Sequence, residues 1–196
     1  MKKLIMTALV AMSLFGTAFA QGEEPEANPV LEKKHELRLD AAEALLVPTL
    51  EFNYEYVISK YSGAGAALSV NLSNDIDFEY GQKFAFTPFY RQYFLNKKEY
   101  GARGLFVEGM LQAAGGEYEN YNYYEDYSDP NNPIFESNVT NEDWFNVGAG
   151  LAVGQKWVSN NGFVFELSAG GGRYFAGGDN VPDGFFRGGV SVGYRF

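Results

Sequence analysis

The sequence predicts an all-β fold: an eight-stranded antiparallel up-and-down transmembrane β-barrel with a charged, side-chain-filled lumen. Three observations lead to this prediction. Apolar and polar residues alternate along most of the chain, which is typical of strands with one apolar face. Short connections alternate with longer ones, as in barrels with turns at one end and loops at the other. Charged residues of both signs recur on the polar face of the strands.

The alternation defines the eight strands one after another. In residues 50–58, for example, Leu50, Phe52 and Tyr54 share one face, and Glu51 and Asn53 lie on the other. The same pattern recurs at residues 37–41, 64–72, 84–94, 105–113, 147–153, 163–169 and 186–196. No run of 18 apolar residues follows residue 20, so any membrane crossing must use strands.

The connections predict which end of the barrel each strand reaches. Residues 59–63, 96–101 and 159–162 are short, polar and turn-like, whereas residues 73–82, 115–143 and 176–184 are longer. The brief first connection, around Val47 and Pro48, departs from this rule. We expect short periplasmic turns and longer outward loops.

The N-terminus carries an export signal. Lys2 and Lys3 precede an apolar run, and Ala18-Phe19-Ala20 has the small residues of a cleavage site. We therefore expect a signal peptide over residues 1–20, cleaved after Ala20. Residues 21–34 are acidic and proline-containing, which favours a disordered periplasmic lead-in before a barrel over residues 35–196.

The composition excludes several function classes. The chain has 15 Lys and Arg against 25 Asp and Glu, and removal of Lys2 and Lys3 leaves 13 against 25, a net charge of −12. Such acidity disfavours nucleic-acid binding. The absence of cysteine excludes disulfides and thiolate chemistry, and the only histidine is His35. We expect no cofactor.

The charged residues on the polar face of the strands indicate which face turns toward the lumen. It carries six acidic and five basic residues: Glu36, Arg38, Asp40, Glu51, Glu55, Arg91, Glu108, Lys156, Glu166, Arg187 and Arg195. This balance favours pairing in a confined lumen, because unpaired charges away from water are costly. We expect Arg91 at the centre of the network, since its strand has no acid of its own, with Glu51, Glu55 and Glu108 as partners. Leu151 is expected to face lipid and Ala152 the lumen.

Aromatic residues on the apolar face gather near the short turns. They are Tyr54, Tyr56, Phe94, Phe163 and Tyr194, with Trp157 close by. An aromatic girdle of this kind is typical of a membrane interface.

The last strand resembles the C-terminal targeting strand of bacterial outer-membrane barrels, with Val190, Val192, Tyr194 and Phe196 on one face. The wider pattern, including residues 88–94 before a lysine-containing turn, resembles a family of uncharacterised small outer-membrane β-barrel domains, similar in architecture to OmpA and OmpX. The resemblance implies an outer-membrane location, outer-membrane lipid around the barrel, and the barrel-assembly machinery as a partner of the last strand. It implies no catalytic residue.

Two connections are candidate binding segments. Asp75, Asp77 and Glu79 alternate in an acidic loop and form a weak candidate cation site. Residues 115–143 hold eight acids, no Lys or Arg, and five tyrosines, Tyr118, Tyr121, Tyr123, Tyr124 and Tyr127, a composition suited to recognising an extracellular partner. The alternative is a strand extension beyond the membrane that ends in a polar loop.

These features predict a non-enzymatic outer-membrane barrel with a structural or surface-interaction role. A small pore is an alternative, although eight strands with eleven inward charges leave little open space. A lipid-modifying enzyme is another, but His35 is predicted at the periplasmic rim, away from the outer loops. A soluble barrel with an apolar ligand-binding interior is a third.

Overall fold

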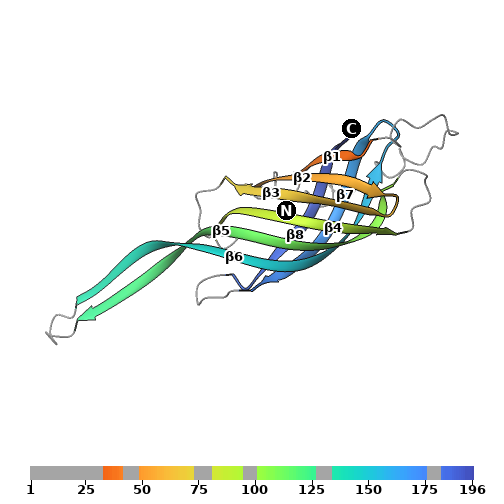
Figure 1. The fold of residues 1–196 in the computed structure, drawn as a ribbon. Helices are drawn as coiled ribbons and strands as arrows, with labels where there is room; N and C mark the ends of the chain where they lie inside the picture. Colours follow the sequence, from red (N-terminus) through yellow and green to blue (C-terminus); the bar gives the residue numbers. More distant parts are fainter. Residues whose placement is uncertain (1–32, 42–48, 73–80, 95–100, 127–133, 176–181) are drawn as a thin grey trace, which may run out of the picture.

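The computed structural model describes residues 33–41, 49–72, 81–94, 101–126, 134–175 and 182–196, the side chains of 119–137 excepted. In this part of the chain, eight strands form one closed antiparallel barrel in sequence order (Figure 1). The strands are β1 (His35–Asp40), β2 (Thr49–Ser59), β3 (Ser62–Asn71), β4 (Gln82–Phe94), β5 (Gly104–Asp126), β6 (Ile134–Val158), β7 (Phe163–Tyr174) and β8 (Gly184–Arg195). The predicted eight-stranded up-and-down barrel is confirmed.

The barrel closes between its first and last strands. β1 pairs with β8 from Glu36↔Arg195 to Asp40↔Ser191. Beyond the first of these pairs, the Phe196 amide donates to the His35 carbonyl at 2.8 Å. We call the barrel end that holds His35 and Phe196 the turn end, because the turns β2–β3 and β6–β7 also lie there. The opposite end is the hairpin end.

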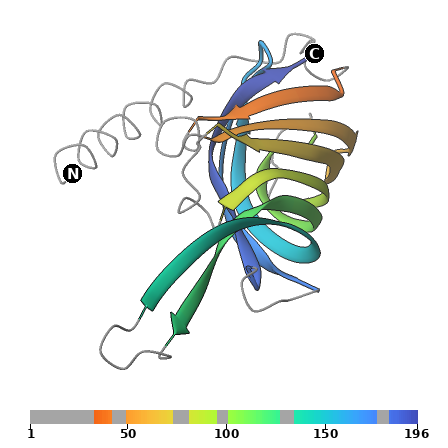
Figure 2. The same ribbon diagram turned by 90° about the vertical axis from the view of Figure 1, so that its left-hand side faces the viewer.

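Strands β5 and β6 continue well beyond the barrel wall. β4 pairs with β5 as far as Gly116, and β7 pairs with β6 from Gly148 onward. Further out, residues 117–126 and 134–143 pair with each other, forming a two-stranded ribbon that projects from the hairpin end (Figure 2). A long loop over residues 115–143 is therefore not what the structure shows; the alternative reading, a strand extension beyond the barrel, is the one that its pairing supports. Cross-strand pairing satisfies the backbone there, where the alternation of apolar residues has stopped.

The burial pattern is polar inside and apolar outside. All eleven charged residues predicted to face the lumen are buried. Large apolar side chains on the other face are exposed, among them Phe52, Phe86, Leu111 and Leu151. The contrast is sharp between neighbours, since Leu151 is 67% exposed and Ala152 only 4%. The alternation thus assigns each side chain to the outer surface or to the lumen.

A glycine allows one of the closest approaches inside the wall. The ring of Phe106 lies across Gly154 of the neighbouring strand, where a Cβ atom would stand 2.4 Å from Phe106 Cζ. Any larger residue at position 154 would displace this ring. The aromatic side chain thereby fills the space that the missing side chain leaves.

The described residues contain no helix with the length and apolar character required to cross a membrane.

Candidate functional site

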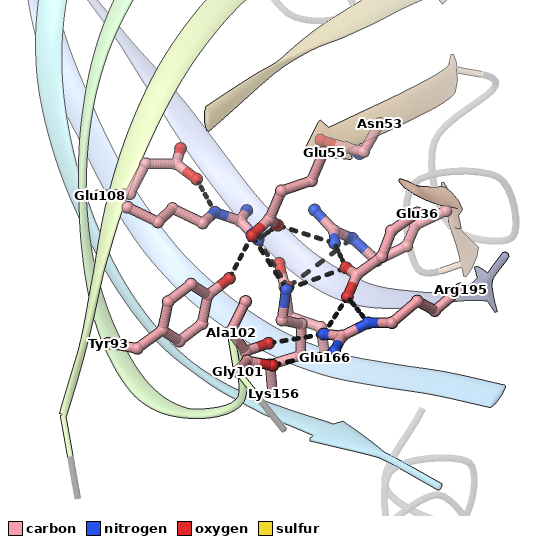
Figure 3. Close-up of polar contacts among 12 residues, drawn as sticks. Glu36, Asn53, Glu55, Tyr93, Gly101, Ala102, Glu108, Lys156, Glu166 and Arg195 are labelled. Carbon is pink, nitrogen blue, oxygen red and sulfur yellow. Dashed lines mark hydrogen bonds and ion pairs between the residues drawn. The ribbon is translucent and has the colours of Figure 1, made fainter. Parts of the chain in front are cut away.

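The candidate site is the lumen, where buried ion pairs join side chains from most strands of the barrel. At the turn end, Arg38, Arg91 and Lys156 meet the carboxylates of Glu55 and Glu166 (Figure 3). Such charges are costly unless paired and hydrogen-bonded, so this cluster depends on its geometry.

Arg91 of β4 links three carboxylates from three other strands. Its Nη1 atom lies 2.9 Å from Glu55 Oε2 and 2.7 Å from Glu166 Oε2, and its Nε atom lies 2.5 Å from Glu108 Oε2. Glu55 and Glu108 are partners that the sequence predicts, whereas Glu166, from β7, is an additional one. Glu51 instead pairs with Arg187 at 3.2 Å. Its expected pairing with Arg91 is therefore wrong.

The carboxylate of Glu55 on β2 accepts hydrogen bonds from four buried side chains. Its Oε2 atom accepts hydrogen bonds from Arg38 and Arg91, both at 2.9 Å, and its Oε1 atom accepts from Lys156 Nζ at 3.0 Å. The Tyr93 hydroxyl also donates to Oε1 at 2.6 Å. Tyr93 was not among the predicted lumen residues, although it lies two residues after Arg91 and therefore on the same face of the strand.

The turn end of the lumen is sealed. Arg195 of β8 pairs with Glu36 and donates hydrogen bonds to the carbonyls of Gly101 and Ala102, both at 2.9 Å (Figure 3). An apolar cluster of Val57, Tyr93, Ala102 and Phe106 packs beside these contacts, and each of its members is at most 7% exposed. Apolar packing and ion pairs together close this end.

A second group of polar contacts occupies the lumen toward the hairpin end. Arg187 of β8 pairs with Glu108 and donates from Nη2 to Glu51 Oε1 at 3.2 Å and to Asn53 Oδ1 at 2.5 Å. Glu108 therefore joins the two groups, because it contacts both Arg91 and Arg187. Asp40 accepts a hydrogen bond from Ser191 at 3.3 Å.

His35, the chain's only histidine, lies on the outer surface at the turn end. Its Nδ1 atom is 2.7 Å from the Tyr54 hydroxyl, and its ring stacks on Phe196 with a centroid distance of 6.1 Å. Near it, the ammonium group of Lys33 lies 5.1 Å from the centroid of the Tyr194 ring. These contacts belong to an aromatic cluster at the rim.

The outward aromatic residues at the turn end include the predicted girdle. Tyr54, Tyr56, Phe94, Phe163 and Tyr194 are all 39–45% exposed. Trp157 packs against Phe165 with a centroid distance of 5.5 Å. The four residues of the predicted targeting pattern, Val190, Val192, Tyr194 and Phe196, are partly or largely exposed.

Of the five tyrosines singled out as a recognition surface, the structure describes the side chain of Tyr118. Its hydroxyl donates to Glu142 Oε2 across the projecting ribbon at 2.7 Å. This hydrogen bond to a carboxylate raises the pKa of Tyr118 above its ordinary value. The side chains of Tyr121, Tyr123, Tyr124 and Tyr127 lie outside the described residues, as do Asp75, Asp77 and Glu79 of the candidate cation site.

The comparisons with known proteins are sparse. No family model matches the chain, and no curated protein matches it. Among solved structures, it is similar to the crystal structure of the N-terminal β-barrel domain of Pseudomonas aeruginosa OprF, with 15% sequence identity and a TM-score of 0.49. The match covers 83% of this chain and 96% of that chain. The fold assignment itself rests on the strand pairing and barrel closure described above.

Proposed function

We propose that this protein is a non-enzymatic β-barrel of the bacterial outer membrane, with a structural or surface-interaction role. One observation carries the proposal: charged side chains fill the inside of the barrel, and large apolar side chains cover the outside. Outer-membrane barrels have this arrangement because lipid surrounds the wall and the strands satisfy one another's backbone groups.

The same observation argues against a soluble ligand-binding barrel. Such a protein would place its apolar residues around the ligand and its charged residues toward water. Here Phe86, Leu111 and Leu151 are 49–67% exposed, whereas Glu55, Glu108 and Lys156 are fully buried. An exposed apolar surface of this extent requires a lipid or detergent environment.

A conducting pore is less well supported than a structural role. Arg91 connects carboxylates from three strands across the lumen. Arg195 and the apolar cluster of Val57, Tyr93, Ala102 and Phe106 close the turn end. Eight strands enclose little more than the side chains that fill them. We therefore propose a barrel without a continuous aqueous channel.

The projecting ribbon supports the surface-interaction part of the proposal. If the turn end faces the periplasm, residues 117–126 and 134–143 extend outside the cell. A long hairpin on a rigid scaffold is a common way to present contacts to a partner. Exposed apolar surface is supplied by Val139, midway along the ribbon, and by Phe145 at its base.

Fractionation combined with conductance tests this proposal. The protein should appear in the outer-membrane fraction, migrate differently on gels before and after boiling, and give no stable large openings in planar bilayers. Protease added to intact cells should cut within residues 117–143 and leave the barrel folded. Recovery in the soluble periplasmic fraction would contradict the membrane location, and stable large openings would contradict the closed lumen.

A further inference from the structure

The surface of the turn end carries positive charge. Its cationic side chains, each at least partly exposed, are those of Lys33, Lys34, Lys60 and Arg103. The acidic side chains described at this end, such as Glu36, point into the lumen and are buried, and the carboxylate of Phe196 is the one acidic group left outside the lumen among the described residues there. The described acids that reach the surface, Glu117, Glu142, Asp143 and Asp183, all lie at the hairpin end. We call the four cationic residues of the turn end the basic rim.

The basic rim joins segments that are far apart in the sequence. The Val57 amide donates to the Lys34 carbonyl at 2.8 Å, and the Ala102 amide donates to the Lys60 carbonyl at 3.0 Å. These bonds hold together the segment before β1, the β2–β3 turn and the connection from β4 to β5. Arg103 follows Ala102 directly. The cations of the three segments therefore lie along one side of the turn end.

Aromatic rings place two of the lysine ammonium groups at the level of a membrane interface. Lys33 Nζ lies 5.1 Å from the centroid of the Tyr194 ring, and Lys60 Nζ lies 5.7 Å from that of Tyr61. Both tyrosines are exposed, at 45% and 49%. Tyrosine rings on the outside of membrane proteins gather at the depth of the lipid headgroups. A lysine beside such a ring keeps its aliphatic stem against apolar surface and its ammonium group among the headgroups.

The charges of Lys33 and Lys34 are available to an external anion. Neither ammonium group forms an ion pair with a described residue. The contrast is with the lumen, where Arg91 and Lys156 are bound by carboxylates. Basic residues clustered next to a membrane-spanning element attract anionic lipids. The two lysines have this position, because they precede β1 directly.

We propose that the basic rim binds the headgroup of an anionic phospholipid, with Lys33 and Lys34 at the centre of the site. The two ammonium groups donate hydrogen bonds to the phosphodiester oxygens. The acyl chains lie along the outward side chains of β1 and β8, where Leu37 pairs with Tyr194 and both are exposed. A soluble polyanion is less well matched, because it gains nothing from aromatic rings beside the cations. The proposal rests on the membrane location proposed above and adds the class of lipid and its place on the barrel.

Solution NMR on the isotopically labelled full chain, refolded in an amine-oxide detergent, tests the proposal. Phosphatidylglycerol and phosphatidylcholine with the same short acyl chains are titrated separately, and the backbone amide shifts are followed. A basic residue near an anionic lipid surface contributes about fivefold to affinity. Phosphatidylglycerol should therefore shift the amides of residues 33–35 and bind at least about fivefold more tightly than phosphatidylcholine. Inorganic phosphate at the same concentration should shift these amides much less, which separates a lipid headgroup from a free anion.

A charge-matched pair of variants connects the lipid preference to the turn end. The double substitution Lys33→Gln with Lys34→Gln removes two positive charges from the basic rim and should abolish the preference for phosphatidylglycerol. Lys83→Gln with Arg173→Gln removes two positive charges from the hairpin end, where Asp183 and Glu142 are exposed, and should leave the preference unchanged. Gel migration before and after boiling checks that both variants fold.

The outcomes separate this site from its alternatives. Equal binding of the two lipids by the unsubstituted protein would overturn the proposal, as would a preference that persists without Lys33 and Lys34 or that is lost equally in the hairpin-end variant. Tighter binding of polyglutamate than of phosphatidylglycerol at the same amides would assign the basic rim to a soluble acidic partner instead. Recovery of the protein in the outer-membrane fraction, together with equal binding of the two lipids, would overturn the headgroup site alone. Recovery in the soluble periplasmic fraction would also overturn the proposed function.

Discussion

At the residue scale, Arg91 is the side chain on which the lumen network depends most. It contacts Glu55, Glu108 and Glu166, all of which are buried. Arg91→Ala should lower the free energy of unfolding by about 3 to 5 kcal/mol, because it leaves buried carboxylates with fewer partners. Urea unfolding of the barrel in lipid vesicles measures the change.

Two further variants separate the buried network from a general effect of losing an arginine. Arg173→Ala removes an exposed arginine and should change stability by no more than about 0.5 kcal/mol. Adding Glu166→Gln to Arg91→Ala should restore part of the loss, because it removes one uncompensated charge. An Arg91→Ala protein as stable as Arg173→Ala would contradict the role given to Arg91.

Gly154 provides a packing test at the same scale. Gly154→Ala places a methyl group 2.4 Å from Phe106 Cζ and 2.6 Å from the Leu167 carbonyl oxygen, so it should destabilise the barrel by about 1 to 3 kcal/mol. The control is Gly109→Ala, whose added methyl group would be 4.0 Å from Leu151 Cδ2. The control should be neutral or slightly stabilising, because alanine reduces the entropy of the unfolded chain. Equal unfolding midpoints for the two variants would refute this account.

The lumen shows how far side-chain contacts can be predicted from the sequence. Alternation alone identifies Glu55, Arg91 and Glu166 as residues of the inner face. It does not give the stagger of the strands along the barrel axis. The contact of Arg91 with Glu166 across the barrel was therefore missed. The same reason explains why a pocket lined by Ser69 of β3 and Phe185 of β8 was not predicted, since the closure of the sheet brings these residues together.

At the element scale, the outward face of β6 tests whether the wall meets lipid. Leu151 is 67% exposed and lies in the part of β6 that pairs with both β5 and β7. Leu151→Arg should cost about 2 to 4 kcal/mol in lipid vesicles, as expected for a charge near the bilayer midplane. Thr140→Arg, on the projecting ribbon, should cost less than about 1 kcal/mol. Equal costs for the two substitutions would place Leu151 outside the lipid.

The ribbon itself should be separable from the barrel. Residues 117–126 and 134–143 pair with each other and with no other strand of the described chain. Replacing residues 120–140 by a short turn should therefore leave the barrel able to assemble, since closing a shorter loop changes the entropy little. Gel migration before and after boiling reports assembly.

A deeper deletion provides the contrast. Removing residues 111–149 also removes the pairs Ala113↔Phe86 and Ala114↔Ala85 with β4, and it should prevent assembly. Failure of the shorter deletion would show that the ribbon contributes to folding.

The strands also show where prediction from sequence succeeds. All eight were predicted because the outward face of each is apolar, as with Phe52 on β2 and Val107 on β5. The extra length of β5 and β6 was only one of two readings, because the sequence beyond Gly116 no longer alternates between apolar and polar residues. The same backbone pairing continues there without that signal.

At the scale of the whole molecule, the two ends of the barrel differ in charge. Exposed or partly exposed residues at the turn end include Lys33, Lys34 and Lys60, whereas Glu142 and Asp143 lie on the ribbon at the hairpin end. The chain as a whole is acidic, with a formal net charge of −10.

The pairing of the first strand with the last also determines when the barrel can be completed. Asp126 pairs with Ile134, eight positions further on, so the β5–β6 hairpin can form while the rest of the chain is still open. Glu36 and Arg195 are separated by 159 positions, and contacts over such distances form slowly because the chain must first lose the entropy of a long loop. We therefore expect closure of the sheet to follow formation of the β5–β6 hairpin. Until it occurs, β1 and β8 each present an unpaired edge.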